Sequence, residues 1–174
     1  MPNPFLVLLM KSFVTILFSL FSIQSFSQSD AYSYQLNKII LDAKSGFINI
    51  RSTIKSISKQ GDTLFNSKIQ LEGTTQNEID RSYSDTTQLI YYFSCRIDSS
   101  TVKDAKKIVE KFKNKTRKAL DKSYKVEPLY QHYGPYLGTS NGYIFRGSEA
   151  IITITYGKIG NYPFAKSYLM VHKP

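Results

Sequence analysis

Cysteine and histidine are nearly absent from this sequence, which contains one cysteine, Cys95, and two histidines, His132 and His172. A single cysteine cannot form a disulfide within the chain, and no cysteine or histidine pair has the spacing of a zinc site. The glycine-rich patterns that hold nucleotide phosphates, G-x-x-x-x-G-K and G-x-G-x-x-G, are missing too. We therefore expect no metal ion and no cofactor. Cys95 is interpreted as a small buried thiol.

Acidic residues are also scarce. The 174 residues include 13 Asp and Glu against 23 Lys and Arg, which gives a formal net charge of +10. Tryptophan is absent, so the 13 tyrosines and 11 phenylalanines must supply the aromatic bulk of the core. Because a basic surface attracts polyanions, the composition favours an anionic partner.

The longest apolar run lies near the N-terminus, where residues 13–23 follow Lys11. Ser25 and Ser27 occupy the −3 and −1 positions of a signal-peptidase site, so we predict a secretory signal peptide over 1–27, with Met10 as an alternative start. The run is shorter than the ~20 residues that a membrane span needs, and an uncleaved anchor is the alternative. Residues 28–174 are predicted to form one secreted or periplasmic domain without a transmembrane span.

The clearest secondary-structure pattern runs from Thr87 to Leu120. Alternation of apolar and polar residues over 87–97 predicts a strand packed on one side, with Cys95 on its apolar face. Thr101 and Asp104 have the spacing of a capping box, which marks the start of a helix. After the cap, mainly apolar residues recur at helical spacing and form one stripe that we expect to face the core: Val102, Ala105, Ile108, Val109, Phe112, Thr116, Ala119 and Leu120. We expect this helix to lie on a sheet, with its lysines facing away.

Weaker patterns flank this segment. A helix is predicted over about 31–51 from a regular seam formed by Leu36, Ile40, Ala43, Phe47, Ile50 and Ile54. A strand is predicted over 65–71, a short helical turn after Thr75, and an extended piece over 124–128. Three short strands are predicted at 143–146, 150–156 and 166–172.

These elements predict an α+β fold without internal repeats. We expect a two-layer sandwich in which an antiparallel sheet of about five strands carries two helices on one face, in the order α-β-β-α-β-β-β.

One pattern is typical of a catalytic site. Residues 138–142 match G-x-S-x-G, with Ser140 in the position of a hydrolase nucleophile. A Gly-Pro loop precedes the motif and a predicted strand follows it, whereas a nucleophile elbow needs a strand before it and a helix after it. We interpret the motif as a flexible turn. The acidic spacing of 80–85 suggests a calcium loop, but the required glycine and final carboxylate are missing, so we expect a surface loop.

The first candidate binding surface is the basic face of the helix 101–120. Its candidate residues are Lys103, Lys106, Lys107, Lys111 and Lys118. Their positive field would attract an anionic partner, and the alternative is an ordinary solvated helix face. Nucleic acid is a poor match, because this face has a single arginine, Arg117, and no stacking aromatic residue.

The second candidate is a tyrosine-rich segment, predicted to be a loop, around Gly134 and Pro135. Its candidate residues are Tyr130, Tyr133, Tyr136 and Tyr143. Tyrosine offers a flat ring for stacking and a polar tip, so these residues could line a groove. They could equally cover one end of the sheet.

Together, these observations predict an exported, non-catalytic binding or structural module. Its expected partner is an anionic or glycan-like component of the cell envelope, or an acidic protein. The alternatives are a small hydrolase that uses Ser140 and an oligomer-forming interaction protein that associates through a helix over 36–54.

Overall fold

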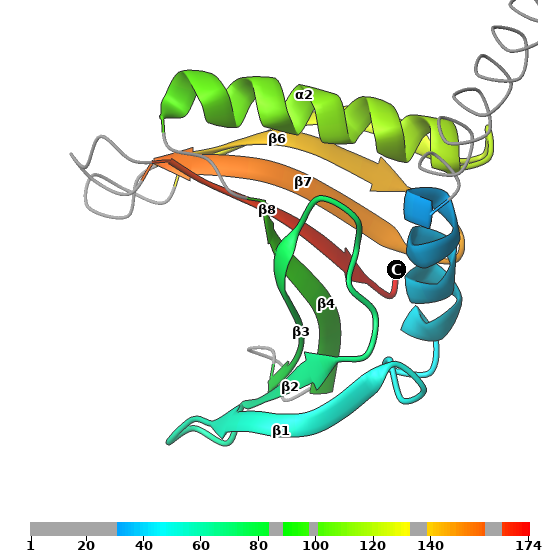
Figure 1. Ribbon diagram of the computed structural model, residues 1–174, viewed down its shortest axis with the longest axis vertical. Coiled ribbons are helices and arrows are strands. Elements are labelled where there is room, and N and C mark those ends of the chain that lie inside the picture. Colours follow the sequence, from blue (N-terminus) through cyan, green and yellow to red (C-terminus); the bar gives the residue numbers. More distant parts are fainter. Residues whose placement is uncertain (1–30, 84–88, 98–100, 133–138, 159–164) are drawn as a thin grey trace, which may run out of the picture.

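The computed structural model describes residues 31–83, 89–97, 101–132, 139–158 and 165–174. The described chain begins in a helix, seen over 31–43, and continues through four strands, the helix α2 and four further strands (Figure 1). The bounds of the labelled elements are β1 Arg51–Ile57, β2 Thr63–Ser67, β3 Thr75–Tyr83, β4 Leu89–Ile97, α2 Val102–Ala119, β5 Lys125–His132, β6 Thr139–Arg146, β7 Ile151–Lys158 and β8 Ala165–His172.

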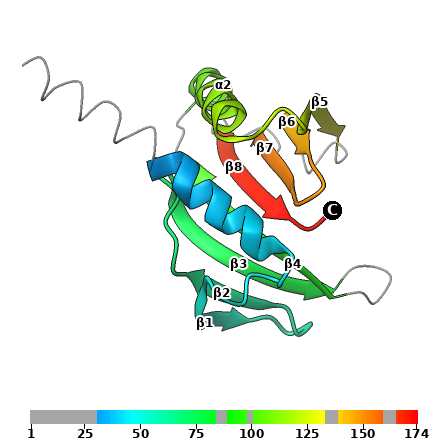
Figure 2. The same ribbon diagram turned by 90° about the vertical axis from the view of Figure 1, so that its right-hand side faces the viewer.

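All eight strands form one curved antiparallel sheet, in the order β1-β2-β3-β4-β8-β7-β6-β5 (Figures 1 and 2). The sheet consists of two four-stranded meanders that join where β4 pairs with β8. Each meander follows a helix in the chain, so the arrangement of one helix and four strands occurs twice. This ordering places β5 and β1 at the two ends of the sheet.

The core lies between the sheet and the two helices, which share one sheet face. Phe93, Cys95 and Ile97 of β4 are buried on this face, as the alternating pattern predicted. Val109 and Phe112 of α2 belong to the same buried cluster. The first helix joins the cluster through Tyr32, Leu36, Ile39, Ile40 and Ala43. The α+β class, the antiparallel sheet and the pair of helices are therefore confirmed.

The start of α2 agrees with the predicted capping box. Thr101 is the N-cap, and its hydroxyl oxygen accepts a hydrogen bond from the Asp104 backbone N–H at 3.1 Å. The same hydroxyl donates to the Asp104 carboxylate at 2.6 Å. This pair satisfies one of the free N–H groups of the first turn and places a negative charge at the positive end of the helix dipole.

The predicted strand count and element order were wrong. The described chain has eight strands rather than about five, and four of them precede α2. The segment after Thr75 is the nine-residue strand β3, not a helical turn. Its central apolar residue, Ile79, is fully buried between neighbours on β2 and β4, while Glu78 and Asp80 occupy the opposite face. Asp80 and Ser82 therefore belong to a strand and not to a loop.

The predicted helix over 31–51 was also too long, and no continuous helix covers 36–54. Gly46 and Phe47 have φ angles of 68° and 61°, which end the helix, and β1 begins at Arg51. The buried Asp42 carboxylate holds this turn, because it accepts hydrogen bonds from the backbone N–H groups of Asn49 at 3.0 Å and Ile50 at 3.1 Å. Phe47 and Ile50 thus reach the core from a turn, whereas Ile54 is exposed on a strand.

Candidate functional site

A groove between α2 and the β5–β6 hairpin consists of two hollows, its first and second parts. Their linings meet at the Glu110–Lys113 ion pair and at the consecutive residues Glu127 and Pro128. The first part has a volume of about 320 Å³ and is lined by Lys106, Val109, Glu110, Pro128, Leu129, Tyr130, Asn141, Gly142, Tyr143 and Tyr156. The second part has a volume of about 570 Å³ and is lined by Lys113, Asn114, Arg117, Lys122, Tyr124, Lys125, Val126 and Glu127. We call the whole depression the α2–β5 groove.

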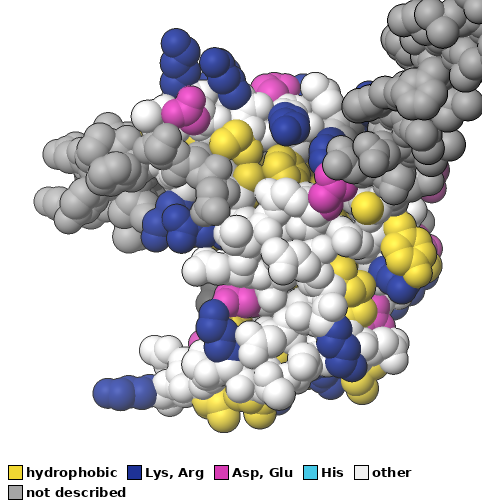
Figure 3. Space-filling view, in the orientation of Figure 1, with side chains coloured by type: hydrophobic (Ala, Val, Ile, Leu, Met, Phe, Trp, Pro, Cys, Tyr) yellow, Lys and Arg dark blue, Asp and Glu magenta, His cyan; other side chains and the backbone are white. Residues whose placement is uncertain are grey.

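One side of the α2–β5 groove is a charged stripe on α2. Its members are Lys106, Glu110, Lys113 and Arg117. At 100° per residue these four positions fall within about 60° of arc, beside the apolar stripe that faces the sheet. Figure 3 shows Lys and Arg side chains along the upper edge of the molecule, where α2 lies. The cations of this stripe therefore border the groove, while Lys103, Lys107, Lys111 and Lys118 face solvent and Lys115 pairs with Glu72.

The opposite side of the first part is formed by tyrosines of β5, β6 and β7. In the β5–β6 ladder Tyr130 pairs with Asn141, and Pro128 pairs with Tyr143. Asn141 in turn pairs with Tyr156 of β7, so Tyr130 and Tyr156 belong to one row across the sheet. Tyr130 is 66% exposed, an unusual amount for so large an aromatic residue. These rings provide a flat apolar wall with hydroxyl tips.

A compact cluster of Tyr143, Glu110 and Lys113 joins the two parts of the groove. The Tyr143 hydroxyl donates a hydrogen bond to the Glu110 carboxylate, and Lys113 Nζ lies 3.2 Å from the other Glu110 oxygen. This hydrogen bond holds the pKa of the Glu110 carboxyl below its ordinary value, and the same carboxylate raises the pKa of the Tyr143 hydroxyl. The three side chains thereby fix one another at the centre of the groove.

The second part of the groove is strongly basic. Lys113, Arg117, Lys122 and Lys125 line it, with Glu127 as the only carboxylate among its lining residues. Arg117 donates a hydrogen bond to the Tyr124 carbonyl oxygen at 2.7 Å, and Glu127 forms an ion pair with Arg146 at 3.4 Å. Lys122 and Lys125 are exposed. This half of the groove can therefore receive negatively charged groups.

The structure brings together three of the residues that the sequence suggested. Lys106 from the basic helix and Tyr130 and Tyr143 from the tyrosine-rich segment line the same part of the groove. Lys103, Lys107, Lys111 and Lys118 are exposed on α2 but do not line it. Tyr133 and Tyr136 lie outside the described residues.

Several groove residues were missed by the sequence-based selection. Lys113, Arg117, Lys122, Lys125 and Tyr156 line the groove. The sequence did contain a signal for Lys113 and Arg117, because their spacing from Lys106 places all three on the same side of a helix. Tyr156 carried no such signal, because only the pairing of β6 with β7 brings it near Tyr143.

The G-x-S-x-G motif has a structural explanation. Ser140 lies within β6, paired with Gln131 of β5 and Gly157 of β7, so the predicted flexible turn was wrong over 139–142. β6 leads into β7 and not into a helix, which is unlike a nucleophile elbow. A Cβ atom on Gly142 would stand 1.9 Å from the Ile154 carbonyl oxygen, so close strand packing accounts for this glycine.

Two other predictions concern metals and the thiol. Within the described ranges, no group of three or more His, Cys, Asp or Glu side chains is placed to hold a metal ion. Cys95 is 1% exposed and unpaired, and burial raises the pKa of its thiol to about 12. The thiol is therefore protonated at neutral pH, as expected of a structural cysteine.

No protein-family model, curated protein or solved structure matches this chain. None of the helices in the described segments has the length and apolar character needed to cross a membrane. The predicted signal peptide over 1–27 lies outside the described residues.

Proposed function

We propose that this protein is an exported, non-catalytic binding module whose α2–β5 groove holds an anionic glycan of the cell envelope. The single observation that carries the proposal is the meeting of Lys106, Tyr130 and Tyr143 in one groove, next to a basic second half. The predicted secretory signal supplies the location.

The tyrosine wall suits a sugar chain. The exposed Tyr130 ring can stack against the apolar face of a pyranose, while tyrosine hydroxyls and the Asn141 amide can bond to sugar hydroxyls. Such sites combine an aromatic surface with a few well-placed polar groups. The first half of the groove would therefore hold the sugar ring.

The basic half suits the acidic groups of the chain. Five cationic side chains line the whole groove against two carboxylates, Glu110 and Glu127, and both carboxylates already have protein partners. Carboxylate or sulfate groups would gain charge-assisted hydrogen bonds from Lys122, Lys125 and Arg117. The positive field would also speed their association at low salt.

An acidic peptide is the competing partner, since β5 is an end strand with one unpaired edge. Pro128 lies in the middle of β5 and has no N–H to offer an added strand. Edge prolines are a common protection against strand addition. A glycan that rests on side chains is therefore favoured over a peptide that must pair with the backbone.

Titration calorimetry with a hexauronide and a matching neutral hexaose tests this proposal. We expect the hexauronide to bind more tightly, and Tyr130→Ala to weaken its binding by about fivefold to tenfold. Tyr34→Ala is the matched control, because Tyr34 is similarly exposed, at 61%, but lies on the first helix and does not line the groove. Equal losses in the two variants, or equal binding of both sugars, would contradict the proposal.

A further inference from the structure

The charges of the α2–β5 groove are divided unevenly between its two parts. Among the described lining residues, the first part has one cation and one carboxylate, Lys106 and Glu110. The second part has one carboxylate, Glu127, and four cations: Lys113, Arg117, Lys122 and Lys125. A chain that lies along the groove therefore meets a nearly neutral surface at one end and a basic surface at the other.

The two parts are far enough apart to hold different rings of one sugar chain. At about 1.5 Å per residue, α2 rises about 16 Å between Lys106 in the first part and Arg117 in the second. Tyr130 lines only the first part, whereas Lys122 and Lys125 line only the second. The ring that stacks on Tyr130 is therefore not the ring whose acidic group meets the two lysines.

Glu110 decides which kind of ring fits the first part. The Tyr143 hydroxyl holds the pKa of this carboxyl below its ordinary value, so the group is ionised at neutral pH and can only accept hydrogen bonds. Its side chain is 40% exposed, and its two oxygens contact Tyr143 and Lys113, which leaves acceptor capacity on both. The hydroxyl groups of a neutral sugar can use that capacity, whereas a uronate at the same place would face a like charge.

The cations of the second part can receive an acidic ring. Within the described ranges, neither Lys122 nor Lys125 forms an ion pair. Asp121 precedes Lys122 in the chain, but it does not line the groove, and its carboxylate accepts hydrogen bonds from Ser123. A uronate in the second part would thus gain charge-assisted hydrogen bonds from both lysines.

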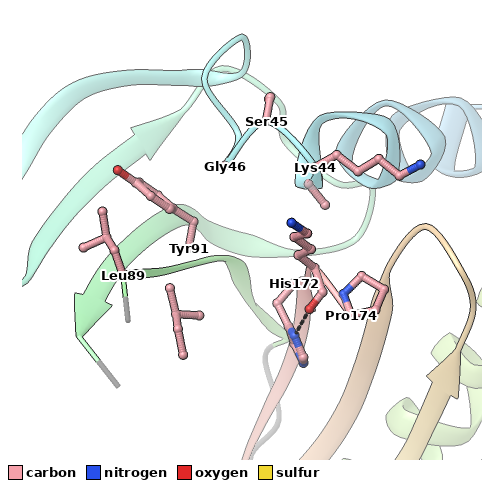
Figure 4. Close-up of a pocket in the computed structure, with 10 residues that line it drawn as sticks. Lys44, Ser45, Gly46, Leu89, Tyr91, His172 and Pro174 are labelled. Atoms are coloured by element: carbon pink, nitrogen blue, oxygen red, sulfur yellow. Dashed lines mark hydrogen bonds between the residues drawn. The ribbon is translucent and has the colours of Figure 1, made fainter. Parts of the chain in front are cut away.

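Another hollow, of about 670 Å³, lacks this combination of charges. It lies between the turn after the first helix, the start of β4 and the end of β8 (Figure 4). None of its described lining residues is Asp or Glu, and Lys44 pairs with Glu149 at 2.5 Å. In Figure 4 the Lys44 side chain extends away from Leu89 and Tyr91. This hollow offers sugar hydroxyl groups no ionised acceptor, so we expect no sugar chain to bind there.

We propose that the α2–β5 groove binds an oligosaccharide in which neutral sugars alternate with uronic acids, and that Glu110 is its specificity-determining residue. The neutral ring rests on Tyr130 beside Glu110, and the uronic acid lies against Lys122 and Lys125. A chain of uronic acids alone would put a carboxylate beside Glu110, and a neutral chain would leave the lysines without a partner. This inference rests on the proposed function and adds the order of the sugars to it.

Titration calorimetry at physiological salt tests the order of the sugars with two hexasaccharides, the hexauronide and a chain that alternates N-acetylglucosamine with glucuronic acid. We expect the alternating chain to bind at least about threefold more tightly, although it carries half as many carboxylates. In backbone amide NMR, the alternating chain should shift the amides of 106–117 and Tyr130 and leave those of Leu89 and Tyr91 unchanged.

Three variants separate the charge of Glu110 from its contacts. Glu110→Gln removes the charge and should bring the two affinities within about twofold of each other, mainly because the hexauronide gains affinity. Tyr143→Phe removes the hydrogen bond to Glu110 but keeps the charge, so the preference should remain. Glu127→Gln is the matched control, because it removes a carboxylate from the second part and should change both affinities by the same factor. Thermal unfolding confirms that each variant is folded.

The outcomes distinguish this inference from the proposed function. Equal or tighter binding of the hexauronide to the native protein, or an unchanged preference in Glu110→Gln, would overturn the inference and leave the glycan proposal intact. A loss of the preference in Tyr143→Phe or in Glu127→Gln would also overturn it. Absence of binding by both chains, or amide shifts confined to Leu89 and Tyr91, would contradict the inference and the proposed function together.

Discussion

Lys113 Nζ lies 4.0 Å from the centroid of the Tyr143 ring, and both side chains also contact Glu110. A lysine above a tyrosine ring is attracted by the electron-rich face. The contact joins α2 to β6 at the centre of the groove and helps to fix a ring that also packs against the core. The ligand surface is therefore partly built before a ligand arrives, which reduces the entropy lost on binding.

The first prediction concerns pH. Because the Tyr143 hydroxyl holds the pKa of Glu110 below its ordinary value, Tyr143→Phe should raise that pKa toward normal. A carboxyl whose folded pKa is depressed stabilises the fold above its unfolded pKa, and this contribution disappears as the pH falls through the folded pKa. Carboxyl carbon NMR of both proteins measures the shift. An unchanged Glu110 pKa in the variant would contradict the contact.

The second prediction concerns the contact between the helices. The Tyr32 hydroxyl and Thr116 Oγ1 are buried and lie 2.7 Å apart. Tyr32→Phe alone should lower the free energy of unfolding by about 1 to 2 kcal/mol, because the Thr116 hydroxyl loses its partner. Thr116→Val in the same protein should recover part of that loss. Denaturant unfolding measures these two variants and Thr116→Val alone, and strictly additive losses would show that the two hydroxyls are not coupled.

The third prediction concerns the turn after the first helix. The Asp42 carboxylate accepts hydrogen bonds from Ser45, from both nitrogens of Asn49 and from the Ile50 N–H. Asp42→Asn puts an NH₂ group where an acceptor is needed, so we expect a loss of about 3 kcal/mol in the free energy of unfolding. Asp121→Asn is the control, since Asp121 is exposed and its carboxylate accepts hydrogen bonds from Ser123, two residues along the chain. Similar small losses in both variants would refute the role of Asp42.

The fourth prediction concerns Cys95. With the thiol pKa raised to about 12 by burial, a disulfide reagent at pH 8 should not react with the native protein. The same reagent should label one thiol per chain after unfolding in denaturant. Rapid labelling of the native state would mean that β4 is not covered by the helices.

Secondary structure was predicted most accurately where the hydrophobic periodicity and the helix-capping residues indicate the same element boundaries. The segment 87–120 alternates, carries a capping box and then repeats at helical spacing, and the described part of it folds accordingly. β3 was missed because Ile79 is the only buried apolar residue among its described side chains, so no alternation was visible. The first helix was overextended because Phe47 and Ile50 keep helical spacing, although they reach the core through a turn with positive φ angles.

The sequence indicated which residue types could bind a ligand but not how they come together in the groove. Its residue types are visible in the sequence, but the side of α2 that borders the groove depends on where the β5–β6 hairpin lies in the sheet. That position follows from the pairing of β4 with β8 and of β7 with β6, which are contacts between distant parts of the chain. Periodicity within one element cannot indicate such contacts.

The most direct test of the binding proposal compares two double charge reversals that change the net charge equally. Lys106→Glu with Lys122→Glu alters the groove, whereas Lys103→Glu with Lys118→Glu alters exposed positions that do not line it. At 0.15 M salt, where screening acts over about 8 Å, the groove variant should lose at least about tenfold in affinity for a hexauronide. The outer variant should lose less than about threefold. Equal losses in both variants would show that the groove does not hold the anion.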